Sequence, residues 1–371
     1  MLFLFVLLLS LTGMLKAQVT TAGMSGKVMA DEESVIGATV VAVHEPSGTS
    51  YGTVTNVDGR FSLQGMRSGG PYKVTVSYIG YQTAIYTDIQ LQLGETYSLN
   101  VTLHEASELL GEITITASKS KFSAEKTGAT TNISSEQLTT LPSINRSISD
   151  FTRISPYASG NSFGGRDGRS NTFTVDGANL NNNFGLSSGL PGGGNPISLD
   201  AIDEVQVVIA PYDVRQANFI GAGINAITKS GTNAYRGSAY MYFNNEVMRG
   251  NKIGDTDFGV RAEESKTVYG ATFGGPIIKD KLFFFANVEY EKSPQQVITW
   301  RAAKEGETPN NSTISRTTEA DLAEFSQILK DKYGYNTGSF TDFPADVTNL
   351  KLLGRIDWNI NQGNKLSVRY N

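Results

Sequence analysis

The chain has 371 residues, a formal net charge of −5 and an apolar content of 39%. It contains no cysteine, which excludes disulfides, thiolate metal sites and cysteine nucleophiles. Two histidines, His44 and His104, are too few for a histidine-rich metal site, and nothing around them suggests catalysis. Because no long basic run occurs, nucleic acid is not an expected partner. We therefore expect no catalytic residue, no cofactor and no metal.

The first element is an apolar run of 14 residues, "LFLFVLLLSLTGML" (2–15). As a helix it would be about 21 Å long, which is shorter than the roughly 30 Å hydrocarbon core of a bilayer. Small and polar residues follow at "KAQVTTAG", so we interpret residues 1–17 as a signal peptide cleaved near Ala17. The alternative is a buried core helix. No Lys or Arg precedes the run, which leaves open a start further upstream.

Residues 18–106 read as short strands and turns. Alternating runs such as "ATVVAVHE", "GTVTNVDGRFSL" and "YKVTVSYIGYQTAIY" predict a small β-sandwich, and Asp58-Gly59 is the strongest hairpin signal among them. This segment resembles the carboxypeptidase regulatory-like domain, a transthyretin-like sandwich. The stretches "SGKV", "IGATVVAV", "GTVTNVDGRFSL" and "VSYIGYQT" carry the resemblance.

Residues 107–117 form a linker that contains "GEITITA". Ile113 and Ile115 alternate with polar residues, which is the pattern of a half-buried strand. By pattern alone this strand could end the sandwich, begin the next domain, or be a segment that another protein captures. We expect residues 112–117 to be poorly tied to either domain in this chain alone.

Residues 118–230 predict an α+β domain rich in Gly, Asn and Ser. "SSEQLTTLP" is typical of a capped helical turn, with Ser134 or Ser135 at the cap and Pro142 at the end. "SISDFTRIS" predicts a second short helix, and "NTFTVDGANL" predicts a strand entering a tight Asp176-Gly177 turn. "LDAIDEVQVVIAP" predicts a helical turn that feeds a buried strand. We expect Glu204 there to make a salt bridge or a wall contact.

Residues 231–371 carry about five alternating runs of the ~9–11 residues that cross a bilayer as a tilted strand. The connections alternate between long (245–267, 292–348) and short ("IIKDK", "NQGN"), and the second long one contains a predicted surface helix. Long loops alternating with short turns are typical of outer-membrane barrels, whereas a soluble sandwich explains only the alternation. The fold class we expect is mainly β: a sandwich, an α+β domain and the first strands of an incomplete transmembrane β-barrel.

In this order the parts resemble a TonB-dependent outer-membrane receptor, and more narrowly the Oar-like branch found in Bacteroidota. The resemblance rests on "GGRDGRSNTFTVDGANLNNNFGL", "PISLDAIDEVQVVIAPYDVRQANFIGAGINAITKSGTN" and "YRGSAYMYFNNE". It implies that residues 118–230 are the plug of the barrel. It also implies that a TonB-box-like segment lies at Glu112, Ile113, Thr114, Ile115, Thr116 and Ala117.

The resemblance further implies a location in the outer membrane, with the sandwich and the TonB-box-like segment in the periplasm. The implied partners are TonB, which would add a strand to the box, outer-membrane lipid, an extracellular substrate and a surface lipoprotein. Plug-apex contacts to substrate or barrel wall are predicted at Arg166, Asp167, Arg169 and Asn171.

The implied function is import of an extracellular substrate through a plugged barrel, driven by TonB. Five strands cannot close a barrel, so we expect a chain that continues beyond Asn371. The alternative is an outer-membrane binding or adhesion protein for carbohydrate or protein, without active transport. A peptidase is a third hypothesis, which only the name of the regulatory-like domain suggests.

Overall fold

The computed structural model describes residues 19–30, 32–105, 113–116, 129–143, 146–181, 195–211, 213, 216–217, 219–250, 252–257, 265–296, 300–310, 314–340 and 344–371. The expected signal peptide lies outside these residues. No helix in the described ranges is both long and apolar enough to cross a membrane. The chain divides into two compact units: residues 1–238 with 272–287 and 352–371, and residues 239–271 with 288–351.

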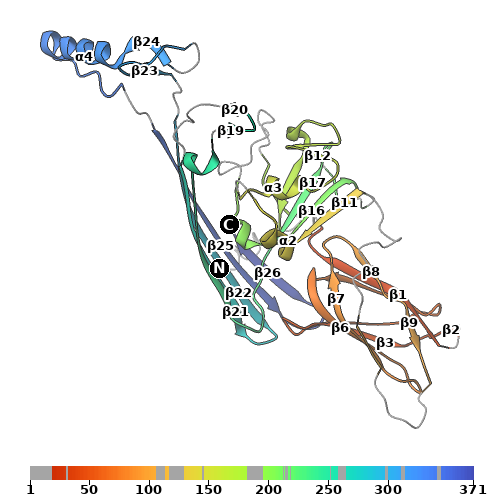
Figure 1. Cartoon of the computed structure of the whole chain (residues 1–371). Coiled ribbons are helices and arrows are strands. Elements are labelled where there is room, and N and C mark those ends of the chain that lie inside the picture. Colours follow the sequence, from red (N-terminus) through yellow and green to blue (C-terminus); the bar gives the residue numbers. More distant parts are fainter. Residues whose placement is uncertain are drawn as a thin grey trace, which may run out of the picture. The chain divides into compact units, whose positions relative to one another are not determined.

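The first domain, which we call the sandwich, consists of two sheets (Figure 1). In one sheet β1 pairs with β2, β5, β8 and β9, and the other has the order β10-β7-β6-β3-β4. The strands are β1 (Ala22–Ala30), β2 (Glu33–Ser34), β3 (Thr39–His44), β4 (Thr49–Val54), β5 (Arg60–Met66), β6 (Gly69–Ser77), β7 (Ala84–Leu91), β8 (Thr96–Ser98), β9 (Val101–Leu103) and β10 (Ile113–Thr116).

Alternate residues of these strands form one apolar core between the two sheets. In β3, for example, Val40, Ala42 and His44 are buried while Thr39 is exposed. The side chains of Met24, Met66, Tyr72, Val74 and Val76 are fully buried in the same core. Burial of a side chain of this size stabilises the fold by about 1.5–3 kcal/mol, so the period-2 pattern accounts for the sandwich that the sequence predicts.

The Asp58-Gly59 turn forms, but it does not close a hairpin. Gly59 has φ = +70°, and the Asn56 side chain accepts hydrogen bonds from the backbone N–H groups of Asp58 and Arg60. The strands on either side join different sheets, since β4 pairs with β3 and β5 pairs with β1. The local turn signal was right, and the hairpin inferred from it was wrong because strand pairing is decided by the two-sheet core.

His44 lies inside the sandwich beside Tyr72. The Nδ1 atom of His44 is 2.7 Å from the Ser47 hydroxyl oxygen, and its ring centroid is 5.0 Å from that of Tyr72. Burial, aided by the positive charge of Arg67, lowers the pKa of His44 from 6.5 to about 3. The folded sandwich therefore holds the neutral imidazole.

This burial predicts that the sandwich loses stability in acid. The unfolded chain binds a proton at His44 below about pH 6.5 and the folded chain does so only below about pH 3, so the contribution is complete above pH 6.5. Between pH 6.5 and pH 3 the contribution of His44 to stability falls by about 1.4 kcal/mol for each unit by which the pH is lowered. Hydrogen exchange of β3 and β6 amides should show this slope in the wild type. The prediction fails if the His44→Phe variant has the same slope.

The segment Ile113–Thr116 is a strand of the sandwich. We expected residues 112–117 to be poorly tied to either domain, and this expectation was wrong for the four described residues. They form β10, which pairs in parallel with Ala84–Thr87 of β7. β10 is the end strand of its sheet among the described residues, so its outer edge carries backbone groups that no described strand pairs. Glu112 and Ala117 lie outside the described residues.

The second domain, which we call the central domain, is an α+β fold around one sheet with the order β11-β16-β17-β14-β15. Two short helices and two 3-10 turns accompany it. Its elements are β11 (Ala129–Ser134), α2 (Ser135–Thr140), α3 (Ile148–Thr152), β12 (Ala158–Ser159), β13 (Ser162–Phe163), η2 (Gly168–Ser170), β14 (Thr172–Val175), β15 (Ala178–Asn179), η3 (Leu199–Ala201), β16 (Ile202–Ala210) and β17 (Gly223–Thr228).

Local signals place the ends of these elements as the sequence predicts. Ser134 caps α2, with a reciprocal bond between its backbone N–H and the Gln137 side chain. Asp176 and Gly177 have φ values of +49° and +85°, which join β14 and β15 in a tight turn. The fully buried rings of Phe151, Phe163 and Phe173 fill the core.

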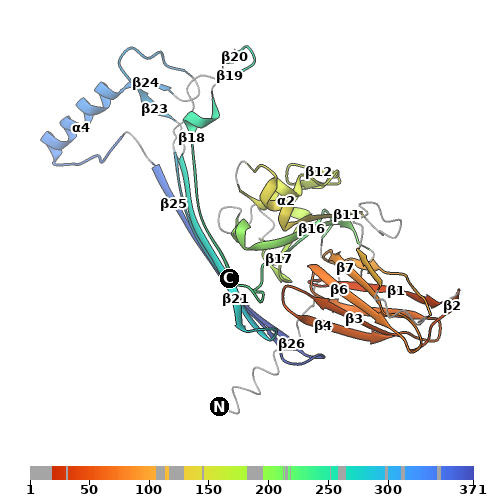
Figure 2. The same cartoon turned by 60° about the horizontal axis from the view of Figure 1, so that its bottom comes forward.

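The last part of the chain forms a sheet with the order β18-β21-β22-β25-β26, which we call the long-strand sheet. Figures 1 and 2 show these strands side by side along their length. Their bounds are β18 (Arg236–Asn245), β21 (Ser265–Ile278), β22 (Leu282–Gln296), β25 (Pro344–Asn359) and β26 (Lys365–Tyr370). The number and order match the five strands that the alternation predicts, and the sheet is open.

Three of these strands are longer than we expected. β21, β22 and β25 have 14, 15 and 16 residues instead of ~9–11. At about 3.3 Å per residue they measure about 46–53 Å, more than the roughly 30 Å of a hydrocarbon core. Strand pairing continues past the apolar stretch, because the ladder needs backbone partners and not apolar side chains.

The faces of the long-strand sheet invert the pattern of a water-soluble domain. On β22 the polar Asn287, Glu289 and Glu291 are buried, while Val288 and Tyr290 are exposed. β25 repeats this arrangement: Lys351 and Asp357 are buried, whereas the exposed side chains are apolar, namely Leu350, Leu352, Ile356 and Trp358. An apolar exposed face with a polar inner face is the pattern of strands that meet lipid on the outside.

Polar side chains join neighbouring strands on this inner face. Nζ of Lys351 lies 2.8 Å from Glu289 and 3.1 Å from Glu291, and Nζ of Lys266 lies 2.9 Å from Glu291. The Tyr240 hydroxyl donates to Glu289 at 2.8 Å. Four strands of the sheet are thus connected through charged and polar groups on its inner face.

The long connections carry small elements of their own. They are η4 (Glu246–Arg249), β19 (Lys252–Ile253), β20 (Thr256–Asp257), β23 (Arg301–Ala303), β24 (Ile314–Thr318) and α4 (Glu319–Tyr333). The helix that the sequence predicts in the second loop is α4. Thr318 caps its start through a bond from the Asp321 N–H, and Gly334 ends it in the left-handed region.

Candidate functional site

The four residues predicted at the apex of the central domain lie around η2, and they do not form one cluster. Arg166 is exposed. Arg169 pairs with Asp167 at 3.0 Å, and both side chains are about half exposed. The Arg169 guanidinium, which donates to Asp167, lowers the pKa of that carboxyl. An exposed pair of this kind contributes little to stability. Because both side chains are about half exposed, both charges are accessible to a ligand.

Asn171 has a structural position. Its side-chain oxygen accepts a hydrogen bond from the Ala222 N–H at 3.0 Å, and its side-chain amide donates to the Asn161 carbonyl at 2.8 Å. A Cβ at Gly221 would lie 2.3 Å from this side-chain oxygen, so the Gly221 backbone passes directly beside it. Asn171 therefore ties the start of β14 to the segment that enters β17. Substrate contact at these four positions stays a prediction.

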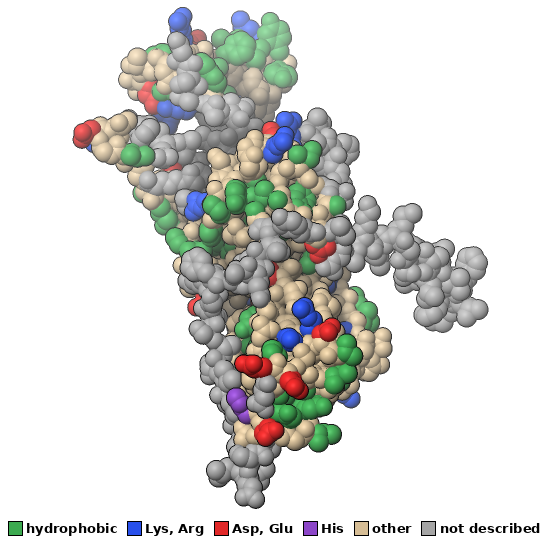
Figure 3. Space-filling model, turned by 90° about the vertical axis from the view of Figure 1, so that its right-hand side faces the viewer, with side chains coloured by type: hydrophobic (Ala, Val, Ile, Leu, Met, Phe, Trp, Pro, Cys, Tyr) green, Lys and Arg blue, Asp and Glu red, His purple; other side chains and the backbone are tan. Residues whose placement is uncertain are grey.

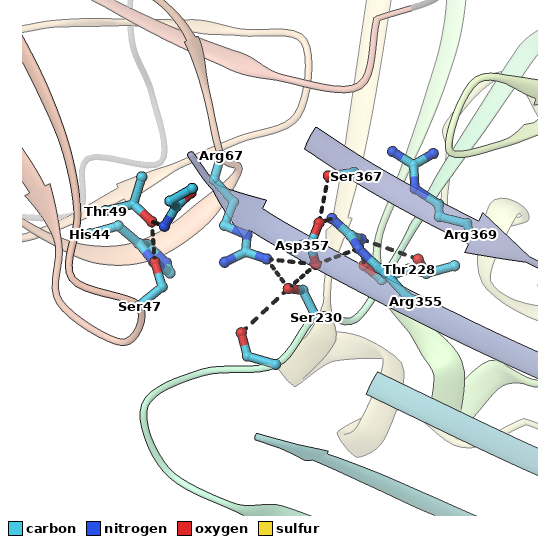
Figure 4. A network of polar contacts seen from close by, with 12 residues as sticks. His44, Ser47, Thr49, Arg67, Thr228, Ser230, Arg355, Asp357, Ser367 and Arg369 are labelled. Atoms are coloured by element: carbon cyan, nitrogen blue, oxygen red, sulfur yellow. Dashed lines mark hydrogen bonds and ion pairs between the residues drawn. The ribbon is translucent and has the colours of Figure 1, made fainter. Parts of the chain in front are cut away.

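A buried polar network centred on Asp357 joins three parts of the first unit (Figure 4). Arg355 donates to both carboxylate oxygens of Asp357, at 2.8 and 3.0 Å. Ser230, which follows the central domain, and Ser367 of β26 each donate to the same carboxylate at 2.5 Å. Arg67 of the sandwich lies 3.4 Å from it and also donates to Ser230. We call these residues the Asp357 network.

Arg355 and Arg369 extend the Asp357 network into the central domain. Arg355 donates to the Thr228 carbonyl oxygen at 2.6 Å and lies 3.8 Å from Asp176. Arg369 donates to the Asp176 carbonyl oxygen at 2.6 Å. Asp176 in turn accepts bonds from the Thr228 N–H and hydroxyl, at 2.9 and 2.6 Å. The β14–β15 turn and the end of β17 are therefore fixed to the inner face of β25 and β26 by charged groups.

Apolar contacts accompany this polar attachment. Phe285 of β22 and Leu353 of β25 belong to the same core cluster as Phe173, Val175 and Ala226 of the central domain. Both are almost fully buried. The central domain thus packs on the long-strand sheet through a small apolar centre with the Asp357 network beside it.

Sequence reasoning missed most of the Asp357 network. It placed Asp176 only in a turn and assigned no contact to Arg355, Asp357 or Arg369, which fall within the alternating runs of residues 231–371. The one usable signal is that Arg and Asp sit two apart on β25, where residues of one face are neighbours. Arg67 carries no such signal, because it is 290 positions from Asp357 in the sequence.

A cavity of about 10 Å³ is lined by Thr172, Gln216, Phe219 and Asn225, among others, and has room for about one water molecule. Acidic and basic side chains are interspersed on the face that Figure 3 shows. No group of three or more His, Asp or Glu side chains in the described ranges is arranged to hold a metal ion.

Two family models match parts of this chain. Residues 23–104 match the carboxypeptidase regulatory-like domain, and residues 227–371 match an outer membrane β-barrel domain. A curated relative, the TonB-dependent transporter Oar of Myxococcus xanthus, is 25% identical over 338 residues. The match covers 86% of this chain and 30% of the relative. The chain thus spans about 30% of the length of that relative.

Solved structures with a similar arrangement include two receptors. The siderophore receptor PirA of Acinetobacter baumannii has 19% identity and a TM-score of 0.40, with 63% of this chain and 29% of the receptor covered. The ferric enterobactin receptor PfeA of Pseudomonas aeruginosa has 14% identity and a TM-score of 0.42, with 66% and 33% covered.

The two family models agree with the fold class and with the inverted faces of the long-strand sheet. The regulatory-like model falls on the sandwich, and the barrel model falls on the long-strand sheet. The curated relative is described as a transporter and not as an enzyme. Most of the chain is thus homologous to the TonB-dependent transporter Oar, and two parts of it match a carboxypeptidase regulatory-like domain and an outer membrane β-barrel domain.

Proposed function

We propose that this chain is the plug-bearing part of a transporter that binds a substrate outside the cell and imports it when TonB pulls on the plug. In this proposal the central domain is the plug, the long-strand sheet is the barrel wall that it closes, and the sandwich lies in the periplasm. Residues 112–117 are the segment that TonB captures. The contact set of Asp176 and Thr228 with Arg355 and Arg369 carries the proposal.

These contacts are suited to a plug that has to move. A central domain held by apolar packing alone would expose that surface to water whenever it left the wall, at about 25 cal/mol per Å². Charged side chains regain hydrogen bonds from water when they separate, so the net energy of each bond is only about 0.5–3 kcal/mol. The wall contacts of Asp176 and Thr228 therefore resist thermal motion and still open under an applied pull.

The open edge of β10 supports the capture of TonB by strand addition. An added strand gains affinity from main-chain hydrogen bonds along an unpaired edge. β10 is an end strand of the described sheet, with β7 on its other side. A strand added to that edge would extend the sandwich sheet from five to six strands.

A pair of proline substitutions tests this proposal. Successive N–H groups of a strand point to opposite edges, so Ile113→Pro and Thr114→Pro each remove a donor from a different edge of β10. One of them should weaken binding of the purified periplasmic domain of TonB at least tenfold and leave the sandwich fold intact. The other should instead loosen the pairing with β7. Binding can be measured by surface plasmon resonance, and the fold by hydrogen exchange of β7.

Two controls make the result decisive. Ile113→Val and Thr114→Ser keep every backbone donor and should bind TonB within twofold of the wild type. Deletion of residues 112–117 should abolish binding. If TonB binds the deletion variant as well as the wild type, the proposed capture segment is wrong, and the proposed function loses its energy source.

A further inference from the structure

A turn of the sandwich is clamped by the central domain through both backbone groups of Leu93. The Leu93 N–H donates to the two carboxylate oxygens of Glu204 at 3.0 and 3.1 Å. The Leu93 carbonyl accepts from the Gln206 side-chain amide and, at 3.4 Å, from that of Asn132. Leu93 is fully buried, and Glu204 and Gln206 are almost so. We call Leu93 with these three side chains the Leu93 clamp.

The clamp side chains come from regular positions of the central sheet. Glu204 and Gln206 are two apart on β16, so they share a face. Asn132 of β11 is the cross-strand partner of Gln206. The sequence had led us to expect a salt bridge or wall contact at Glu204, and this was wrong, because its carboxylate holds a backbone N–H of the sandwich.

The shape of the turn also fits the clamp. Gly94 has φ = +69°, and a Cβ there would lie 2.7 Å from the Gln206 amide nitrogen. A side chain at this position would therefore be strained by the backbone conformation and would have to displace the Gln206 amide. Asn132 adds a bond to the Glu95 side chain at 3.2 Å on the far side of Gly94.

The clamp lies directly after the strand that holds β10. β7 ends at Leu91, two residues before Leu93, and its first half, Ala84–Thr87, pairs with β10. On the other side of the clamp, β16 pairs with β11 and β17, and β17 ends at Thr228 in the wall contacts. A continuous set of paired strands and hydrogen bonds thus runs from β10 to the Asp357 network.

We propose that the sandwich is a force relay: a pull on β10 passes through β7 and the Leu93 clamp to β16, and so loads the plug sheet directly. This inference rests on the proposed function, because TonB supplies the pull. The residues that the relay assigns are Leu93, Gly94, Asn132, Glu204 and Gln206.

The alternative route for the force is the covalent connection, residues 117–128, between β10 and β11. These 12 residues span at most about 40 Å when fully extended, so that route transmits a pull only when the connection is taut. The clamp is in contact already at rest. The two routes also load different strands first, since the connection pulls on the end of β11 and the clamp pulls on the middle of the sheet.

Single-molecule pulling on the full-length protein in a lipid bilayer separates the two routes. The handle is the bound periplasmic domain of TonB. In the wild type, we expect the first rupture to open the central sheet and to release more than about 40 Å of chain. In the double variant Glu204→Ala/Gln206→Ala, the sandwich should part from the central domain first, at a lower force, with a step of at most about 40 Å.

Gly94→Ala disrupts the clamp from the sandwich side and should give the same early step. The control is Gln64→Ala, which changes an exposed sandwich side chain whose amide bonds Ser62, and which should behave as the wild type. The relay is overturned if both clamp variants give wild-type traces, or if the wild type itself shows the early step. If the TonB handle attaches equally well to a variant that lacks residues 112–117, the proposed function fails instead. In that case TonB does not pull on β10, and the relay is not the route of the force.

Discussion

Replacing Asp357 with alanine should lower the free energy of unfolding of the attached central domain by about 3–5 kcal/mol. The reason is that Arg67 and Arg355 would keep their partly buried charges and lose the carboxylate that both of them face. Ser230 and Ser367 would lose an acceptor at the same time. Guanidinium titration of the full-length protein in detergent, followed by hydrogen exchange of β14 and β17, measures this loss.

Two further variants show whether the charge or the shape is responsible. Asp357→Asn keeps the volume of the side chain and removes its charge. It should therefore lower the free energy of unfolding by part of the amount that alanine does. Combining Asp357→Ala with Arg355→Met should cost clearly less than the sum of the two single changes, because each single change leaves one charge unpaired. Asp255→Ala, at an exposed loop position, should stay within about 0.5 kcal/mol of the wild type. If the loss of unfolding free energy in the double variant equals the sum of the two single losses, Asp357 and Arg355 are not coupled in the way the Asp357 network requires.

The second large effect is a dependence of the Leu93 clamp on pH. Burial raises the pKa of Glu204 from 4.5 to about 8, and the neighbouring Asp203 and Glu95 add to the shift, although the Leu93 N–H opposes it. Between these two values the folded chain keeps a proton that the unfolded chain releases. Stability of the clamp should therefore fall as pH rises from 4.5 to 8, by at most about 1.4 kcal/mol per pH unit, and should level off above.

The Glu204→Gln variant isolates this effect. Its side chain cannot ionise, so the clamped state should lose most of the slope over the same pH range. Burial also raises the pKa of Asp203, so the slope that remains in the variant is assigned to that carboxyl. Exchange of the Leu93 amide reports the clamp directly, since this amide donates to Glu204. Equal slopes in the wild type and in Glu204→Gln would show that Glu204 does not carry the dependence.

Local pattern predicted most of the elements because their causes are local. The alternation of β3 and β22, the Ser134 cap and the Asp176-Gly177 turn each depend on side chains a few positions apart. The five strands of the long-strand sheet follow from the same period. Their lengths did not, because β21, β22 and β25 continue beyond the apolar positions that mark a membrane strand.

Local sequence pattern could not predict which strands pair with one another. "GEITITA" reads as a half-buried strand, but nothing in its seven residues says that Ile113–Thr116 lies in parallel beside β7. The same holds for Asp58-Gly59, where the turn is correct and the next strand crosses to the other sheet. Which edge a strand joins depends on the shape of the whole core.

The candidate site was the least predictable part. Asp167 and Arg169 are close in sequence and do meet, yet contacts that join the parts of the first unit link residues as far apart as 111 positions, for Leu93 with Glu204, and 290 positions, for Arg67 with Asp357. Each of these side chains looks like an ordinary surface residue in its own segment. Only the folded chain shows that they are buried and face one another.

The inverted faces of β22 and β25 also set an order of assembly. Val288, Tyr290, Leu352 and Trp358 would be exposed to water if these strands folded in the periplasm, and an open row of such strands aggregates. The sandwich encloses its own core, so it can fold before these strands find an apolar environment. Arg355 and Arg369 can reach Asp176 and Thr228 only once β25 and β26 are in place. Under the proposed function, attachment of the central domain would therefore be the last step of assembly.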